Sequence, residues 1–245
     1  MEDSLLLYLN KRMGKKDEGF CPGDILPGPV VTISREVGCA GVKLAKKLAG
    51  KLNEQGGKCK WKVFSKEIFE EAARELEMDR KKLKTVLNSE GRNTFDEILG
   101  ALGDKRFKSE RKIRKTVAGF IRSIATDGHC IIVGRGGHLI ARDIRNSLHL
   151  RFKAPLDWRV KKIARRHRIS ETEALKFIGK TEKERESFRR NIQAGAPPDE
   201  NYDMEINVSV FRNNDIIEII AKAMIMKGLV MVPKEKTTAA PVPGM

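Results

Sequence analysis

Aromatic side chains are scarce in this sequence, where Phe, Trp and Tyr together make up 6% of 245 residues. Proteins that bind single strands of nucleic acid stack successive bases on aromatic rings, so the scarcity argues against a stacking surface. Long apolar runs are missing as well, and none approaches the ~20 residues that a membrane-spanning helix needs. The start, Met1-Glu2-Asp3-Ser4, has no basic region before an apolar core. We therefore expect a cytoplasmic protein with no membrane partner.

Cysteine is also sparse, and its four residues lie far apart, at Cys21, Cys39, Cys59 and Cys130. No C-x-x-C pair occurs, and no histidines stand at the spacing of a zinc site. The pattern favours free thiols over a metal site.

Positive charge, in contrast, is abundant. The chain has 49 Lys and Arg against 33 Asp and Glu, a net charge of +16, which attracts polyanions such as phosphorylated small molecules or nucleic acid. Seven basic residues lie between Lys105 and Lys115 and could form a nucleic-acid patch. Apolar residues at helical spacing in and after this segment favour a solvated amphipathic helix instead. We expect nucleotide partners and no specific nucleic acid.

The stretch 30–52 changes its hydrophobic period at a glycine-bearing turn. Residues 30–34 are an apolar, β-branched run after Pro27 and Pro29, which predicts a buried strand. From Leu44 onward the apolar residues recur at helical spacing, which predicts a helix. Backbone N–H groups and the positive dipole end of that helix would face a ligand over the strand, a geometry that suits phosphate.

The spacing of this turn departs from the usual phosphate loop, G-x-x-x-x-G-K-[ST]. With Gly41 as the second glycine, Glu36 takes the place of the first one. Val42 then stands where the lysine belongs, and Lys43 where the hydroxyl residue belongs. On spacing alone, a phosphate site and a tight β-to-α turn without a ligand both remain open.

A family resemblance bears on this choice. The segment Ile33–Gly41, with the sequence ISREVGCAG, resembles the opening motif of the cytidylate kinase-like family, which belongs with the P-loop nucleoside monophosphate kinases. Further stretches fit in the same order, at residues 131–136, 154–160 and 180–185, followed by Tyr202-Asp203 and Ile206-Asn207. Together they cover about residues 30–226. Members commonly carry a basic residue directly after the second glycine, where this chain has Val42, with Lys43 one residue later.

The resemblance implies an α/β protein with a P-loop-type three-layer α/β/α fold, a central parallel sheet of about five strands and a helical lid. The main domain is expected over residues 30–228, with a helical insertion at 79–127 and the lid at 170–193. Residues 1–29 are predicted to be an N-terminal appendage and linker, and residues 229–245 a disordered tail.

Hydrophobic patterns place the remaining elements. Strands are predicted at residues 61–64, 130–133, 148–152 and 204–208, and a last helix at 215–226. Two capping boxes, at residues 170–173 and 181–184, predict that the lid is a hairpin of two helices joined at Gly179.

The resemblance assigns donor-phosphate binding to the first loop and the residues beside it, which are Ser34, Arg35, Gly38, Cys39, Ala40, Gly41, Val42 and Lys43. It also implies that the region after the second strand faces the acceptor nucleotide, which makes Ser65, Lys66 and Glu67 candidates. The alternative is that these three residues only start a helix, with Ser65 as its N-cap.

Four arginines are candidates for contact with the transferred phosphoryl group. Arg135 lies between glycines at the carboxyl end of a predicted strand, where α/β sheets bind ligands and where a guanidinium fork fits phosphate oxygens; the alternative is a surface arginine in a turn. Arg159 lies in the family motif. Arg185 and Arg189 are four apart on the lid, so they share a helix face and can meet one polyphosphate.

By resemblance, the expected function is that of a nucleoside monophosphate kinase, which transfers a phosphoryl group from ATP with Mg²⁺ to a nucleotide. Cytidylate (CMP or dCMP) is the favoured acceptor, and the sequence assigns no metal ligands. Such transfer depends on positioning and charge neutralisation, without a covalent nucleophile. One alternative is a nucleotide-binding relative without turnover, because Val42 replaces a basic residue and Lys43 stands in place of a hydroxyl. Another, a nucleic-acid-binding protein, depends only on net charge.

Overall fold

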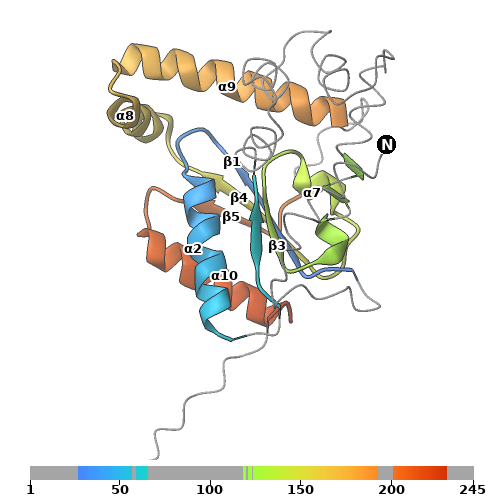
Figure 1. Cartoon of the computed structure of the whole chain (residues 1–245). Coiled ribbons are helices and arrows are strands. Elements are labelled where there is room, and N and C mark those ends of the chain that lie inside the picture. The colour runs from blue at the N-terminus through green and yellow to red at the C-terminus, as the bar shows by residue number, and fades with distance from the viewer. Residues whose placement is uncertain are drawn as a thin grey trace, which may run out of the picture.

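A five-stranded parallel sheet forms the centre of the computed structural model, in the order β2-β3-β1-β4-β5 (Figure 1). The strands are β1 (Val30–Arg35), β2 (Lys62–Phe64), β3 (Cys130–Val133), β4 (Ser147–Lys153) and β5 (Met204–Asn207). Because the strands are parallel, their carboxyl ends lie at one edge of the sheet, with β1 in the middle. The predicted fold class is confirmed.

The structure describes residues 27–56, 59–65, 118–119, 121–122, 124–192 and 201–230. Several predictions fall on other residues and so lie outside the described ones. They concern the first 26 residues of the appendage, the acceptor candidates Lys66 and Glu67, most of the insertion at 79–127, and nearly all of the tail.

Helices cover both faces of the sheet, which gives three layers. On one face, α2 (Gly41–Glu54) and α10 (Asn213–Met226) pack on the odd-numbered residues of β1, Val31 and Ile33. On the other face lie α7 (Gly137–Ile140) and the helical residues 121–122 and 124–127, which pack near Val30. Side chains alternate between the faces of a strand. The side chains of Ser34 and Arg35, the last two residues of β1, therefore lie on opposite sides of the sheet.

Two further helices, α8 (Leu156–His167) and α9 (Glu171–Ile192), form a pair beyond the sheet. The first predicted capping box is present, because Ser170 N donates to Glu173 Oε2 at 2.9 Å and Glu173 N donates to Ser170 Oγ at 3.2 Å. The predicted break at Gly179 is wrong, since α9 is one helix of 22 residues. Ala174 and Ile178 are buried against α8 on the near side of the glycine, and this packing outweighs its weak helix propensity.

Replacing Gly179 by alanine should stabilise the protein by about 1 kcal/mol, because a helix-interior glycine costs about that much relative to alanine. A Cβ atom added at Gly179 meets nothing within 4 Å. Gly50 of α2 offers the same open space and serves as the matched control. Urea unfolding of both variants measures the gain. A loss of stability in Gly179→Ala beside a gain in Gly50→Ala would contradict the continuous α9.

The cysteines and the absence of membrane-spanning segments were both predicted from the sequence. Cys39 and Cys130 are free and buried, whereas Cys59 is disulfide-bonded, so the expectation of free thiols is wrong for Cys59. Within the described residues, no helix is both long enough and apolar enough to cross a bilayer.

Candidate functional site

The loop between β1 and α2, residues 36–40, lies at the carboxyl end of the central strand. Gly38 and Ala40 both have left-handed backbone, with φ of 97° and 49°, and this turns the chain sharply into α2 at Gly41. Ala40 is the N-cap of α2 and makes no side-chain capping bond. The loop therefore directs the positive end of a 14-residue helix toward the edge of the sheet where parallel α/β folds bind ligands.

Glycines in this region make room for arginine side chains. A Cβ atom at Gly38 would lie 3.2 Å from Cβ of Arg159, and one at Gly41 would lie 3.2 Å from Cγ of Arg35. A Cβ atom at Gly134 would lie 2.0 Å from Nη1 of Arg35. The side chain of Arg35 thus extends from the end of β1 to the 134–136 turn after β3, and joins two segments that lie far apart in the sequence.

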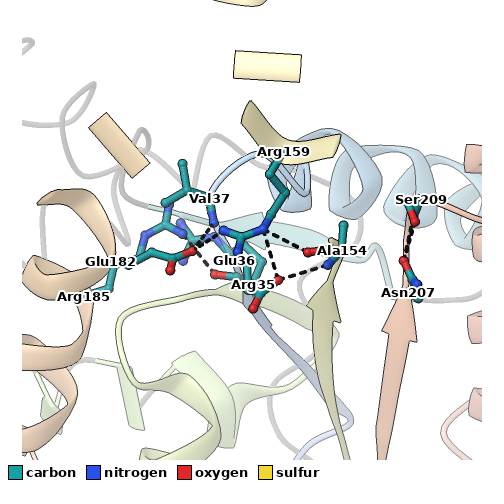
Figure 2. A network of polar contacts seen from close by, with 9 residues as sticks. All are labelled: Arg35, Glu36, Val37, Ala154, Arg159, Glu182, Arg185, Asn207 and Ser209. Atoms are coloured by element: carbon teal, nitrogen blue, oxygen red, sulfur yellow. Dashed lines mark hydrogen bonds and ion pairs between the residues drawn. The ribbon is translucent and has the colours of Figure 1, made fainter. Parts of the chain in front are cut away.

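Arg159 is the centre of a buried polar network (Figure 2). It is 7% exposed, and its Nε donates to the carbonyl oxygen of Ala154 at 3.0 Å. Its Nη1 donates to Glu182 Oε1 at 2.6 Å, and its Nε lies 3.4 Å from Glu36 Oε2. We call Glu36, Arg159 and Glu182 the arginine–glutamate cluster. It links the loop, the start of α8 and α9 through one guanidinium.

Both carboxylates of the cluster also bind the backbone. Glu36 Oε2 accepts the N–H of Ala154 at 3.0 Å, and Glu182 Oε1 accepts the N–H of Val37 at 3.2 Å. Glu182 therefore reaches from α9 to a backbone donor of the β1–α2 loop.

One face of α9 lies over the loop and the neighbouring turn. Arg185 Nη1 donates to the carbonyl oxygen of Arg35 at 3.0 Å, and the guanidinium carbon of Arg135 lies 5.2 Å from the centre of the Phe188 ring. Glu182, Arg185 and Phe188 are spaced three apart, so they share this face. Figure 1 shows α9 crossing above the sheet. The structure thus brings the predicted residues Arg135, Arg159 and Arg185 around one loop.

Arg189, the fourth predicted arginine, lies one turn beyond Arg185 and is half-buried. Its expected role at the phosphoryl group stays a prediction, as do those of the other three arginines.

Ser34 faces the opposite side of the sheet from Arg35 and belongs to a second polar group. His138 is 5% exposed; its Nδ1 lies 3.2 Å from Ser34 Oγ and its Nε2 lies 3.2 Å from the Tyr202 hydroxyl. The rings of His138 and Tyr202 are 4.8 Å apart, and Arg151 lies over the Tyr202 ring at 5.6 Å. His138 was not predicted as a site residue, although His138 directly follows the Gly134–Gly137 segment.

Two motif residues near β5 have structural contacts. Asp203 Oδ2 accepts the N–H of His149 at 2.7 Å, which ties the start of β5 to β4. Asn207 Oδ1 accepts the N–H and the hydroxyl of Ser209 at 3.1 and 2.7 Å, which closes the turn after β5 (Figure 2).

The two residues at the degenerate positions of the loop motif point to different environments. Val42 is half-buried and packs against the core between the sheet and α2, whereas Lys43 is exposed on α2. Lys162 of α8 brings another cation near this helix. Burial lowers the pKa of Lys162, and the charges of Lys43 and Arg166 lower it further.

Cys39 is the one thiol of the loop. Burial, with the Glu36 carboxylate nearby, raises its pKa to about 11, so the thiol stays protonated at neutral pH. A protonated, buried thiol is a poor nucleophile. The loop therefore suits binding through its backbone better than covalent chemistry.

Other predicted positions contribute less to this site. Ser65 is 2% exposed and directly follows β2, at the same edge of the sheet.

Among the described residues, no group of three or more His, Cys, Asp or Glu side chains could hold a metal ion. Lys43, at the position of a magnesium-binding hydroxyl, is itself a cation.

Comparisons with known proteins give relatives of different kinds. Among solved structures, the chain is similar to an uncharacterised protein from Eubacterium ventriosum, with 21% identity, a TM-score of 0.55 and coverage of 80% of this chain and 97% of that one. It is also similar to a shikimate kinase from Bacteroides thetaiotaomicron, with 14% identity, a TM-score of 0.45 and the same coverage. The first likeness shows the fold.

A curated relative covers only part of the chain. It is a uronate isomerase from Corynebacterium glutamicum, 28% identical over 98 residues, which are 40% of this chain and 19% of that protein. The chain therefore spans less than a fifth of that relative's length.

A family model matches far more of the sequence. The model of the cytidylate kinase-like family matches residues 30–210, which include every strand of the sheet, the β1–α2 loop and α9. This protein therefore belongs to the cytidylate kinase-like family and has its kinase-type nucleotide-binding fold.

Proposed function

We propose that the protein transfers a phosphoryl group from ATP to a nucleoside monophosphate, with cytidylate as the favoured acceptor. The observation that carries the proposal is the convergence of Arg135 and Arg185, from segments far apart in the sequence, beside the β1–α2 loop. Cations placed around a phosphate-binding loop supply what phosphoryl transfer needs, because its transition state spreads negative charge over several oxygens. The preference for cytidylate comes from the family alone.

In the proposed reaction, backbone N–H groups of residues 37–41 and the positive end of α2 hold the donor phosphates. Arg135 faces the transferred group from the 134–136 turn, and Arg185 and Arg189 approach from α9. Ser65, at the end of β2, is the described candidate on the acceptor side. Phosphoryl transfer proceeds directly between bound nucleotides, so the protonated Cys39 thiol is not used.

Magnesium would enter with ATP, as the family resemblance implies. Mg²⁺ is usually held by one or two protein side chains together with the phosphates of the nucleotide. In this proposal, the chain's own contribution to charge neutralisation comes from its arginines and from the loop backbone.

A second candidate function is nucleotide binding without turnover. Val42 packs into the core and Lys43 projects from α2 into solvent, so neither provides a cation at the position directly after the second glycine. A phosphate loop without that cation can still bind phosphate through its backbone, but it stabilises the transition state less.

An acceptor panel separates the two functions. Purified protein is incubated with ATP, Mg²⁺ and each of CMP, dCMP, UMP, AMP and GMP, and nucleoside diphosphate formation is followed by chromatography. We expect CDP from CMP and ADP from ATP. Thermal stabilisation by ATP without any product from the panel would favour the binding protein. The absence of both product and ATP-dependent stabilisation would overturn the proposal.

A further inference from the structure

Glu182 makes an unusual pair of contacts for a carboxylate beside a phosphate-binding loop. One oxygen, Oε1, accepts both the N–H of Val37, at 3.2 Å, and Nη1 of Arg159, at 2.6 Å. A backbone N–H of a glycine-bearing loop and a guanidinium are the donors that phosphate oxygens take in proteins. The carboxylate of α9 thus occupies donors that suit a phosphate (Figure 2).

We propose that Glu182 is an internal anion of the β1–α2 loop, which holds these two donors in the free protein and gives them up to a phosphate group of the bound nucleotide. The proposal rests on the proposed function, because it takes the loop to be the phosphate site. The exchange transfers the Nη1 donor of Arg159 from Glu182 to the phosphate. Arg159 then contacts the nucleotide only after Glu182 has left.

Burial supports an exchange in which Glu182 moves and Arg159 stays. The Glu182 side chain is 37% exposed, so its carboxylate regains water when it leaves the loop. The Arg159 side chain is only 8% exposed, and its Nε remains bound to the Ala154 carbonyl and close to Glu36. Arg159 is therefore preorganised for an incoming anion.

The charges point the same way. The arginine–glutamate cluster holds two carboxylates and one guanidinium, so a phosphate that entered beside Glu182 would meet an excess of negative charge. Departure of Glu182 removes that repulsion. The Arg185 contact to the Arg35 carbonyl lies one turn along α9 and does not involve Glu182, so α9 retains a bond to the loop during the exchange.

A purely structural salt bridge predicts the opposite response. If Glu182 only clamps α9 over the loop, its removal loosens the site and weakens the binding of phosphate ligands. If Glu182 competes with phosphate, its removal strengthens binding, because the apparent dissociation constant falls as the fraction of the protein with free donors rises.

The test is isothermal titration of the full chain with inorganic pyrophosphate and with ATP. Glu182→Gln should lower both dissociation constants by roughly fivefold, as expected if Glu182 occupies the donors for most of the time. Glu182→Asp keeps the negative charge but shortens the side chain by one methylene, so its carboxylate oxygen cannot reach both donors. This variant should therefore also bind pyrophosphate and ATP more tightly. The matched control is Glu186→Gln, which removes the same charge from α9 one turn away, at a residue paired with Arg190.

Three results would overturn the proposal: weaker or unchanged binding in Glu182→Gln, an equal gain in Glu186→Gln, or a gain in Glu182→Gln that Glu182→Asp does not share. The proposed function is judged separately. Tighter pyrophosphate binding in both Glu182 variants without phosphorylation of any acceptor would retain the internal anion and reject the kinase. CDP formation with no change in binding would retain the kinase and reject the internal anion. No binding of pyrophosphate or ATP by any variant would reject both the kinase and the internal anion.

Discussion

Arg135→Lys and Arg185→Lys are each expected to lower kcat for CMP phosphorylation by roughly 100-fold, because removal of a positioned donor from a transition state costs about 3 kcal/mol. Lysine keeps the positive charge but lacks the planar fork that binds two phosphate oxygens at once. The dissociation constant for ATP should change much less, since the arginines act on charge that develops during transfer.

Initial rates at saturating ATP and CMP measure kcat, and titration with ATP measures binding. Arg190→Lys is the matched control, because Arg190 is exposed on the same helix and pairs with Glu186 instead of the loop. We expect that variant to keep the wild-type kcat. Unchanged kcat in both Arg135→Lys and Arg185→Lys, in an enzyme that makes CDP, would remove these residues from the reaction.

Arg159→Ala is expected to destabilise the protein by about 3 kcal/mol, because it leaves two carboxylates without the guanidinium that neutralises them. The loss falls toward the lower end of the range for buried ion pairs, since Glu36 and Glu182 are partly exposed, at 27% and 37%. The same substitution also removes Cγ of Arg159, one of the three atoms nearest to the place of a Cβ atom at Gly38, and so leaves space beside the loop.

Urea unfolding at neutral pH measures this effect. Arg166→Ala provides the control on the same helix, at an exposed position where the expected change lies within about 0.5 kcal/mol. A similarly small change in Arg159→Ala would mean that the arginine–glutamate cluster does not hold α9 and the loop together.

Local patterns in the sequence were enough to predict the sheet. The apolar run of residues 130–133 is β3, with the predicted bounds. The predicted strand at 148–152 is one residue shorter than β4 at each end, and the predicted strand at 204–208 extends one residue past β5. Parallel strands buried on both faces need continuous apolar stretches, so each strand carries its own signal. The turn into α2 was equally visible, because the hydrophobic period changes there.

The predicted lid shows where local patterns fail. Thr181 and Glu184 have the spacing of a capping box, yet they lie inside α9, because the same spacing also occurs within a helix. Burial of Ala174 and Ile178 against α8 and Val37 continues the helix through Gly179. No sequence window around residue 180 contains that information.

Hydrophobic period, glycine placement and motif order are properties of neighbouring residues, so they were enough to predict the α/β class, the strands, the loop position and the arginines beside it. Which polar groups meet depends instead on the whole fold. It paired Val37 with Glu182, 145 residues away, and Ser34 with His138, 104 residues away. These contacts exist because β1 lies between β3 and β4 and α9 crosses above its end, and the free energy of that arrangement comes from burial of apolar side chains across the whole sheet.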